Sequence, residues 1–168
     1  MADEIVNRVA QSKLVTFDLE ELYPVGKRVL FDIKDWLYES LILKEKEFRA
    51  FVDAHSWQQY QDNYVALTCS SDAIIPGWAY MLVASKLSSY AKNVVIGDLE
   101  QLESSIYQEI LTQLDVSSFK DKPVIIKGCS NKPVPQNAYI LATTKIQSVA
   151  KNVMYGEACS SVPLFRRK

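Results

Sequence analysis

Several features that often mark a function are scarce or absent in this 168-residue sequence. It has one histidine, His55, and no G-x-S-x-G motif, so a Ser-His-Asp hydrolase site is not expected. The glycine-rich patterns G-x-G-x-x-G and G-x-x-x-x-G-K-[ST], which let the backbone approach phosphate closely, do not occur. There is also no C-x-x-C pair, so the sequence lacks the most specific zinc and redox spacing.

Neither sign of charge is in excess, because 19 Lys and Arg face 20 Asp and Glu and the net charge is -1. This balance gives no electrostatic footprint for nucleic acid or an anionic membrane, so we expect neither as a partner. No apolar run approaches the ~20 residues that span a bilayer, and the first residues are acidic where a signal peptide is basic. We therefore expect a cytoplasmic protein whose three cysteines remain thiols.

With only 5 glycines and 6 prolines, the sequence shows no Gly/Pro/Ser-rich linker. A hydrophobic fraction of 48% and a charged fraction of 23% are ordinary for a folded protein and wrong for a disordered one. The length suits one compact domain, and we predict a single domain over residues 1–168.

An internal repeat organises the second two-thirds of the chain. The segment from Cys69-Ser70 to Gly97 recurs from Cys129-Ser130 to Gly156, with an offset of 60 residues before the proline and 59 after it. Thirteen residues are identical between the two copies, among them Ala91-Lys92-Asn93-Val94 and Ala150-Lys151-Asn152-Val153. This agreement is far above chance and indicates a supersecondary unit that occurs twice.

Periodicity identifies the repeated unit as βαβ, over residues 64–98 and 124–157. Each copy has a short apolar run rich in β-branched residues, a Cys-Ser loop, a proline near a helix start, and a second apolar run that glycine ends. An amphipathic stripe over residues 99–114 predicts a helix that joins the copies. We expect an α/β fold with a mainly parallel sheet and helices on both faces.

Residues 1–62 form an N-terminal α+β extension in this interpretation. Alternation over Leu14–Leu19 predicts a half-buried strand, and Asp32 is placed to cap a helix through Trp36. A second helix is expected from about Lys44 to His55. The segment would add an edge strand and covering helices to the sheet.

The cysteines carry the strongest candidate chemistry. Cys69 and Cys129 each follow the first strand of a repeat, and Cys159 follows the last strand by three residues after Gly156. In one parallel sheet all three lie at the carboxyl edge, where open α/β sheets bind ligands. Three thiolates favour a soft metal, so we predict a zinc ion or an iron–sulfur cluster held by Cys69, Cys129 and Cys159.

A structural zinc site would need a fourth ligand. The candidates are Asp72, Asp98, Glu100, Glu157 and His55, and Glu100 is favoured because the 59-residue offset places it where the second copy has Cys159. A serine follows each cysteine, so Ser70, Ser130 and Ser160 are candidate cofactor contacts, with ordinary helix capping as the alternative.

Three further interpretations of the cysteines stay open. They can be inert, buried thiols, since free cysteine often packs as a small hydrophobe. Cys69 and Cys129 can cycle between dithiol and disulfide in a thiol-redox protein. The edge can also be a docking surface of a binding module without chemistry, because the sequence offers no recognisable general base and assigns no reaction.

The chain resembles a bacterial family, the domain of unknown function 2480 (DUF2480). The resemblance rests on five segments: Val29–Lys34, Leu41–Lys46, Ala66–Pro76, Lys127–Ser130 with Pro133–Pro135, and Met154–Cys159. It covers nearly the full length and implies a small cytoplasmic α/β protein. Genes of this family are associated with iron–sulfur cluster assembly operons, which implies assembly proteins as partners and an accessory role in cluster assembly.

Overall fold

The computed structural model describes residues 13–128 and 131–168 as a mixed α/β chain with two separate sheets. Its contacts divide the chain into two compact units, one formed by Pro24–Ile106 and the other by the residues up to Tyr23 together with Tyr107–Lys168. The single continuous sheet expected from the repeat is therefore wrong. Alternating βα patterns predict parallel strand pairs, but they do not say which pairs share a sheet.

The unit Pro24–Ile106 contains a three-stranded parallel sheet of order β2-β3-β4. Its strands are β2 (Arg28–Asp32), β3 (Tyr64–Thr68) and β4 (Asn93–Ile96). The first four residues of central β3 are all buried, as continuous apolar strands of parallel sheets are. β3 and β4 are parallel neighbours connected through α3 (Gly77–Leu87), so the two predicted strands and their helix lie as expected.

An aromatic and aliphatic core fills this unit. The predicted second helix of the N-terminal segment is α2 (Glu45–Ala54), which buries Phe48 and Val52 on one face. Phe31 of β2 contacts four aromatic rings within centroid distances of 5.2–5.9 Å. Two short 3-10 helices, Lys34–Trp36 and Trp57–Tyr60, supply three of these rings, and His55 at the end of α2 supplies the fourth. Asp32 accepts a hydrogen bond from the backbone N–H of Lys34, so it caps this short turn rather than a long helix.

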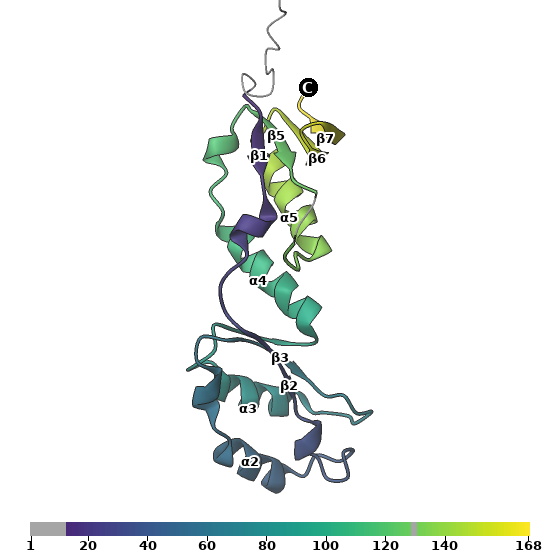
Figure 1. Cartoon of the computed structure of the whole chain (residues 1–168). Coiled ribbons are helices and arrows are strands. Elements are labelled where there is room, and N and C mark those ends of the chain that lie inside the picture. Colours follow the sequence, from purple (N-terminus) through teal and green to yellow (C-terminus); the bar gives the residue numbers. More distant parts are fainter. Residues whose placement is uncertain (1–12, 129–130) are drawn as a thin grey trace, which may run out of the picture. The chain divides into compact units, whose positions relative to one another are not determined.

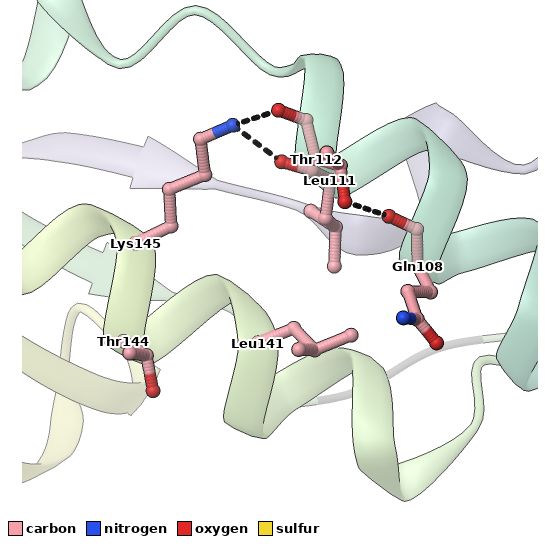
Figure 2. A pocket seen from close by; sticks show the side chains of 6 residues that line it. All are labelled: Gln108, Leu111, Thr112, Leu141, Thr144 and Lys145. Carbon is pink, nitrogen blue, oxygen red and sulfur yellow. Dashed lines mark hydrogen bonds between the residues drawn. The ribbon is translucent and has the colours of Figure 1, made fainter.

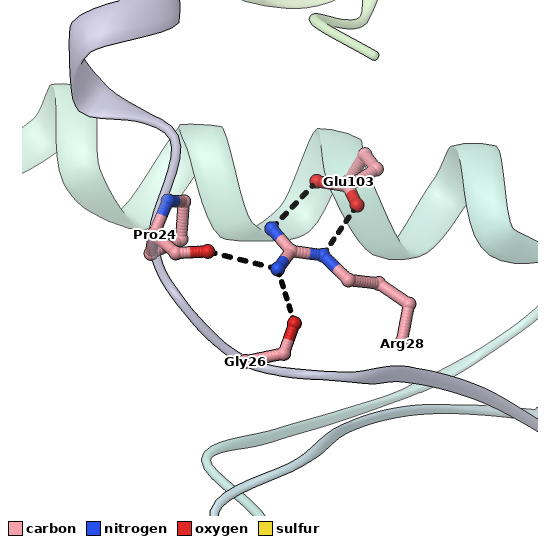
Figure 3. A network of polar contacts seen from close by, with 4 residues as sticks. All are labelled: Pro24, Gly26, Arg28 and Glu103. Carbon is pink, nitrogen blue, oxygen red and sulfur yellow. Dashed lines mark hydrogen bonds and ion pairs between the residues drawn. The ribbon is translucent and has the colours of Figure 1, made fainter. Parts of the chain in front are cut away.

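A buried ion pair joins β2 to the part of helix α4 (Leu99–Gln113) that belongs to this unit (Figure 3). Arg28 Nε donates to Glu103 Oε1 at 2.6 Å, and both side chains are about nine-tenths buried, with 11% and 8% exposed. A second guanidinium nitrogen of Arg28 donates to the carbonyl oxygens of Pro24 and Gly26. Arg28 thus fixes the turn before β2 as well as the helix, and its charge is compensated by four acceptor atoms.

The other unit contains a four-stranded sheet of order β1-β5-β6-β7 (Figure 1). Its strands are β1 (Val15–Phe17), β5 (Pro123–Ile126), β6 (Asn152–Glu157) and β7 (Ser160–Arg166). The first three are parallel, and β7 pairs with β6 in the antiparallel direction. Helix α5 (Gln136–Gln147) connects β5 to β6 and buries Ala138, Ala142 and Ile146 against Val124 and Val153.

The N-terminal segment contributes one edge strand to each sheet. β1 was predicted from alternation, whereas β2 was not, and neither was the C-terminal strand β7. The register explains how β1 and β2 are equivalent: Val15 pairs with Val124 of β5, and Val29 pairs with Val65 of β3. Among residues 13–128 and 131–168, no helix has the length and apolarity to cross a membrane.

Candidate functional site

A group of polar side chains gathers at the carboxyl end of β2 and β3. We call it the Asp32 cluster, and it consists of Asp32, Cys69, Ser70, Ser71 and Tyr80. Asp32 Oδ1 accepts hydrogen bonds from the backbone N–H groups of Lys34 at 2.9 Å and Ser70 at 3.1 Å. Cys69 is half-buried, and its Sγ lies 3.2 Å from Ser71 Oγ. Two strands and the start of one loop thus present a carboxylate, a thiol and hydroxyls at one sheet edge.

Electrostatics within the Asp32 cluster favour an ionised Asp32. Burial opposes the charged form, but hydrogen bonds from the Ser70 side chain and from the backbone N–H groups of Lys34 and Ser70 hold the pKa of Asp32 below its ordinary value. The pKa of Tyr80, on α3, is raised mainly by burial and further by negative charge at Cys69 and Asp32. Tyr80 therefore remains a protonated hydroxyl beside the thiol and the carboxylate.

The other unit has a corresponding group at the carboxyl end of β1 and β5, which we call the Asp18 cluster: Asp18, Glu20, Lys127 and Asn131. Asp18 Oδ1 accepts from the backbone N–H of Glu20 at 2.9 Å, as Asp32 does from Lys34. Asp18 Oδ2 accepts from Lys127 Nζ at 2.7 Å, and this hydrogen bond is the main reason why the pKa of Lys127 is raised. Glu20 Oε2 accepts from the backbone N–H of Asn131 at 2.9 Å.

Of the predicted site residues, the structure brings Cys69 and Ser70 together at the end of β3, where Ser70 binds Asp32. Cys129 and Ser130 lie outside the described residues, between Gly128 and Asn131 of the Asp18 cluster loop. Cys159 is exposed in the turn between β6 and β7, and Ser160 begins β7. Glu100 is exposed in the first turn of α4.

The geometric argument for convergence of the cysteines does not hold, because it required β3, β5 and β6 to belong to one sheet, whereas β3 lies in a different sheet from β5 and β6. Cys69 belongs to the unit Pro24–Ile106, and Cys159 belongs to the other unit. In the part of the chain that the structure describes, no three His, Cys, Asp or Glu side chains are grouped so that they could hold a metal ion. The ligand assignment therefore rests on the sequence positions of the cysteines.

Two of the candidate fourth ligands already have structural roles. His55 ends α2, its Nε2 lies 2.9 Å from Tyr60 Oη, and its ring packs against Phe31 and Trp57. Burial lowers the pKa of His55, so the imidazole is neutral at pH 7. Asp98 caps α4, because its Oδ1 accepts from the backbone N–H of Gln101 while Gln101 Oε1 accepts from the N–H of Asp98.

Sequence reasoning missed Asp18, Lys127 and Tyr80 as members of strand-end clusters. The signal for the two aspartates is present in the sequence: Val15-Thr-Phe-Asp18 and Val29-Leu-Phe-Asp32 share the pattern V-x-F-D. In both cases Phe is buried and Asp ends or follows the strand. The pattern is only four residues long and lies outside the longer repeated segments that contain the cysteines.

A hollow of about 240 Å³ lies between α4 and α5 in the unit that contains both Leu111 and Leu141 (Figure 2). Its main polar group, Lys145 Nζ, donates to the backbone carbonyls of Leu111 and Thr112 near the end of α4. Leu111 O also accepts from the backbone N–H of Leu114, so Lys145 adds a second donor there and its positive charge complements the negative end of the helix dipole. The hollow is therefore a helix-packing gap closed by a capping lysine rather than a ligand site.

The fold and the two clusters define a mixed α/β protein with polar groups at the carboxyl ends of mostly parallel strands. A family model described as "Protein of unknown function (DUF2480)" matches residues 3–167, and the chain belongs to this family. Searches of curated proteins and of solved structures gave no match.

Proposed function

We propose that the protein is a cytoplasmic metal-binding protein in which Cys69, Cys129 and Cys159 supply thiolate ligands to a zinc ion or an iron–sulfur cluster. The observation that supports this best is the placement of Cys69. Its thiol is the first side chain after β3, it is not sealed in the core, and it lies in a cluster with a carboxylate and hydroxyls. Cys69 also packs against the hydrophobic core of its unit, so its polar neighbours rather than its burial are what favour a binding role.

Glu100 is the proposed fourth ligand where zinc is bound, and an iron–sulfur cluster would leave that position open. Ser70, Ser130 and Ser160 would contribute hydroxyl or backbone hydrogen bonds to the thiolates or to the bound group. Support for this role comes from Ser70, which already donates to Asp32 next to Cys69. Hydrogen bonds to sulfur and to neighbouring ligands tune such centres.

As an accessory factor in iron–sulfur assembly, the protein would hold iron or a cluster transiently and pass it to assembly proteins. This part of the proposal comes from the family's gene association. Transient holding is consistent with thiols that remain reachable, since Cys69 is half-buried and Cys159 is exposed.

Metal analysis after anaerobic purification tests the proposal. We expect about one zinc ion per chain, or about two or four iron atoms with an equal amount of sulfide if one cluster is bound, in the wild-type protein. Cys129→Ser should lose most of this metal because two thiolates hold a thiophilic ion poorly. Ser71→Ala, which removes a hydroxyl but no thiolate, is the matched control and should retain the metal. Equal metal content in wild type and Cys129→Ser would reject the site and favour a binding module without chemistry.

A thiol-redox function is the second candidate, and experiments must distinguish it from metal binding. A redox protein would show a reversible disulfide under mild oxidation and no metal dependence of thiol reactivity. Slow alkylation of all three thiols near the ordinary cysteine pKa of ~8.5 would count against redox use.

The duplication of a βαβ unit with helices on both faces is also part of the proposal. Support comes from matching local geometry at an offset of 59 residues. Asp62 and Asp121 both have left-handed backbone before β3 and β5, with φ of 60° and 57°. Gly97 and Gly156 both have positive φ after Ile96 of β4 and Tyr155 of β6, where a side chain would strain the chain. The V-x-F-D strands β1 and β2 would extend each copy to ββαβ.

A further inference from the structure

A second hollow, of about 410 Å³, lies at the amino end of β5 and β6. It is larger than the gap beside Lys145. Val153 is buried on the side of the sheet that α5 covers, and side chains alternate along a strand, so Asn152 and Met154 point away from α5. Both line the hollow, which therefore opens on the face of the sheet opposite to α5.

Residues that pair across three strands line this hollow. Pro123 of β5 pairs with Asn152 of β6, and Asn152 pairs in turn with Arg166 of β7, so these three residues lie in one row across the sheet. Met154 and Pro163 pair in the next row. Because the backbone ladder holds these partners in register, the lining is already formed in the folded chain, as in most small-molecule sites.

A β-bulge shapes the apolar part of the lining. Val153 pairs with Phe165, whereas the next residue, Met154, pairs with Pro163, so Leu164 is left without a partner on β6. A bulge of this kind re-aims the neighbouring side chains. Phe165 both packs against the core cluster and borders the hollow. The hollow therefore presents a thioether, a proline ring and an aromatic ring on one side.

The rim of the hollow carries positive charge that no carboxylate balances. Lys151 and Arg166 line it, none of the described lining residues is acidic, and neither cation forms an ion pair with a described residue. Lys122 is next to Lys151, because the backbone N–H of Lys151 donates to Lys122 O. Arg167, in contrast, binds Asp121 at 2.7 Å. The hollow thus offers two cations, with a third adjacent, to an anionic ligand.

We propose that this hollow binds a nucleotide. Its phosphate lies against Arg166 and Lys151, since a guanidinium donates two parallel N–H groups to phosphate and an ammonium adds a point charge. Its flat base lies against Met154 and Phe165, whose polarisable and aromatic surfaces suit a ring. The amide of Asn152 both donates and accepts hydrogen bonds at the edge of the base. The volume of about 410 Å³ is that of a small-molecule site.

The combination of charge, apolar lining and amide is what favours a nucleotide. A compact anion would use the cations but leave the apolar lining in water, and an apolar ligand would leave Lys151 and Arg166 without a counterion. Charge that only protects the edge strand β7 from pairing would need no hollow beside it. The hollow lies at the amino end of β6, whereas Cys159 follows the carboxyl end of this strand, so the proposal is independent of the thiol site.

An NMR titration of the full chain with AMP tests the proposal. Adenosine and pyrophosphate, titrated separately, probe the base and the phosphate halves of the site. We expect saturable shifts of the backbone amides of residues 151–154 and 163–166, with a dissociation constant of about 1 mM or below. AMP should bind at least about tenfold more tightly than adenosine or pyrophosphate, because only AMP uses the cations and the apolar lining together.

Two neighbouring arginines provide a variant and its matched control. Arg166→Ala should weaken AMP binding at least about tenfold, since it removes the phosphate contact. Arg167→Ala removes the same charge one residue further on, but this arginine binds Asp121 and does not line the hollow, so AMP affinity should change less than about threefold. Circular dichroism verifies that both variants fold. The absence of saturable shifts with AMP, equal affinity for AMP and pyrophosphate, or equal weakening by the two variants would overturn the proposal.

Discussion

Glu103→Gln tests whether the buried ion pair stabilises the unit Pro24–Ile106. Arg28 Nε and Glu103 Oε1 are 2.6 Å apart, and the guanidinium also reaches Glu103 Oε2 at 3.3 Å. Breaking a buried pair costs about 3–5 kcal/mol when the remaining charge is left without compensation. Arg28 keeps the carbonyl oxygens of Pro24 and Gly26 as acceptors, so we expect a loss below that range, about 2–3 kcal/mol of unfolding free energy.

Urea titration followed by tryptophan fluorescence measures this loss selectively. All three tryptophans, Trp36, Trp57 and Trp78, belong to the unit that contains the ion pair, so the signal reports that unit. For a unit of this size a slope of about 1 kcal/mol per molar urea is typical, and the midpoint should fall by about 2–3 M.

Two further variants are compared with Glu103→Gln. Glu45→Gln removes an ion pair with Arg49 in which both side chains are more than half exposed, and it should cost less than about 0.5 kcal/mol. Arg28→Met combined with Glu103→Leu replaces both charges and should recover more than half of the loss. A change below about 0.5 kcal/mol in Glu103→Gln would refute the claim that this pair links β2 to α4 energetically.

Three further changes have expected outcomes. The pKa of Asp32 is lowered despite burial, so ionised Asp32 stabilises the fold above about pH 4, and this stabilisation is lost as the pH falls through the lowered pKa. In Asp32→Asn, the urea midpoint should therefore depend less on pH in the acid range. Burial lowers the pKa of His55, so protonation favours unfolding and stability declines as the pH falls below ~6.5; His55→Gln should reduce that decline between about pH 7 and 5 in the same titration. Lys145→Met removes the cap of α4 and should cost about 1 kcal/mol in thermal unfolding by circular dichroism, with the exposed Lys151→Met nearly neutral.

Apolar periodicity in the sequence predicted most of the helices and strands. Helices α2 and α4 lie within a few residues of their predicted ranges, and β3, α3 and α5 occur in the predicted order within residues 64–98 and 124–157, because buried faces impose periods of two and 3.6 residues on the sequence. β7 was missed because Pro163 interrupts its short apolar run of Val162, Leu164 and Phe165, and a proline argues against a strand in the sequence.

The assignment of strands to sheets could not be read from periodicity. β1 and β2 are close in sequence and share the V-x-F-D pattern, yet each completes a different sheet by pairing with β5 or β3. Pairing between distant strands depends on the packing of whole units, which no local pattern records. For the same reason the sequence predicted Cys69 and Ser70 at a strand end, but not their neighbours Asp32 and Tyr80 from β2 and α3.

Residue-resolved alkylation of the wild-type protein tests the proposed metal binding most directly. The anaerobic protein is treated with iodoacetamide with and without one equivalent of zinc, and mass spectrometry follows the modification of Cys69, Cys129 and Cys159 separately. Because a metal-bound thiolate is a poorer nucleophile than a free one, the account predicts that zinc slows all three reactions together, and that a chelator restores them. Unchanged alkylation of the three cysteines in the presence of zinc would contradict it.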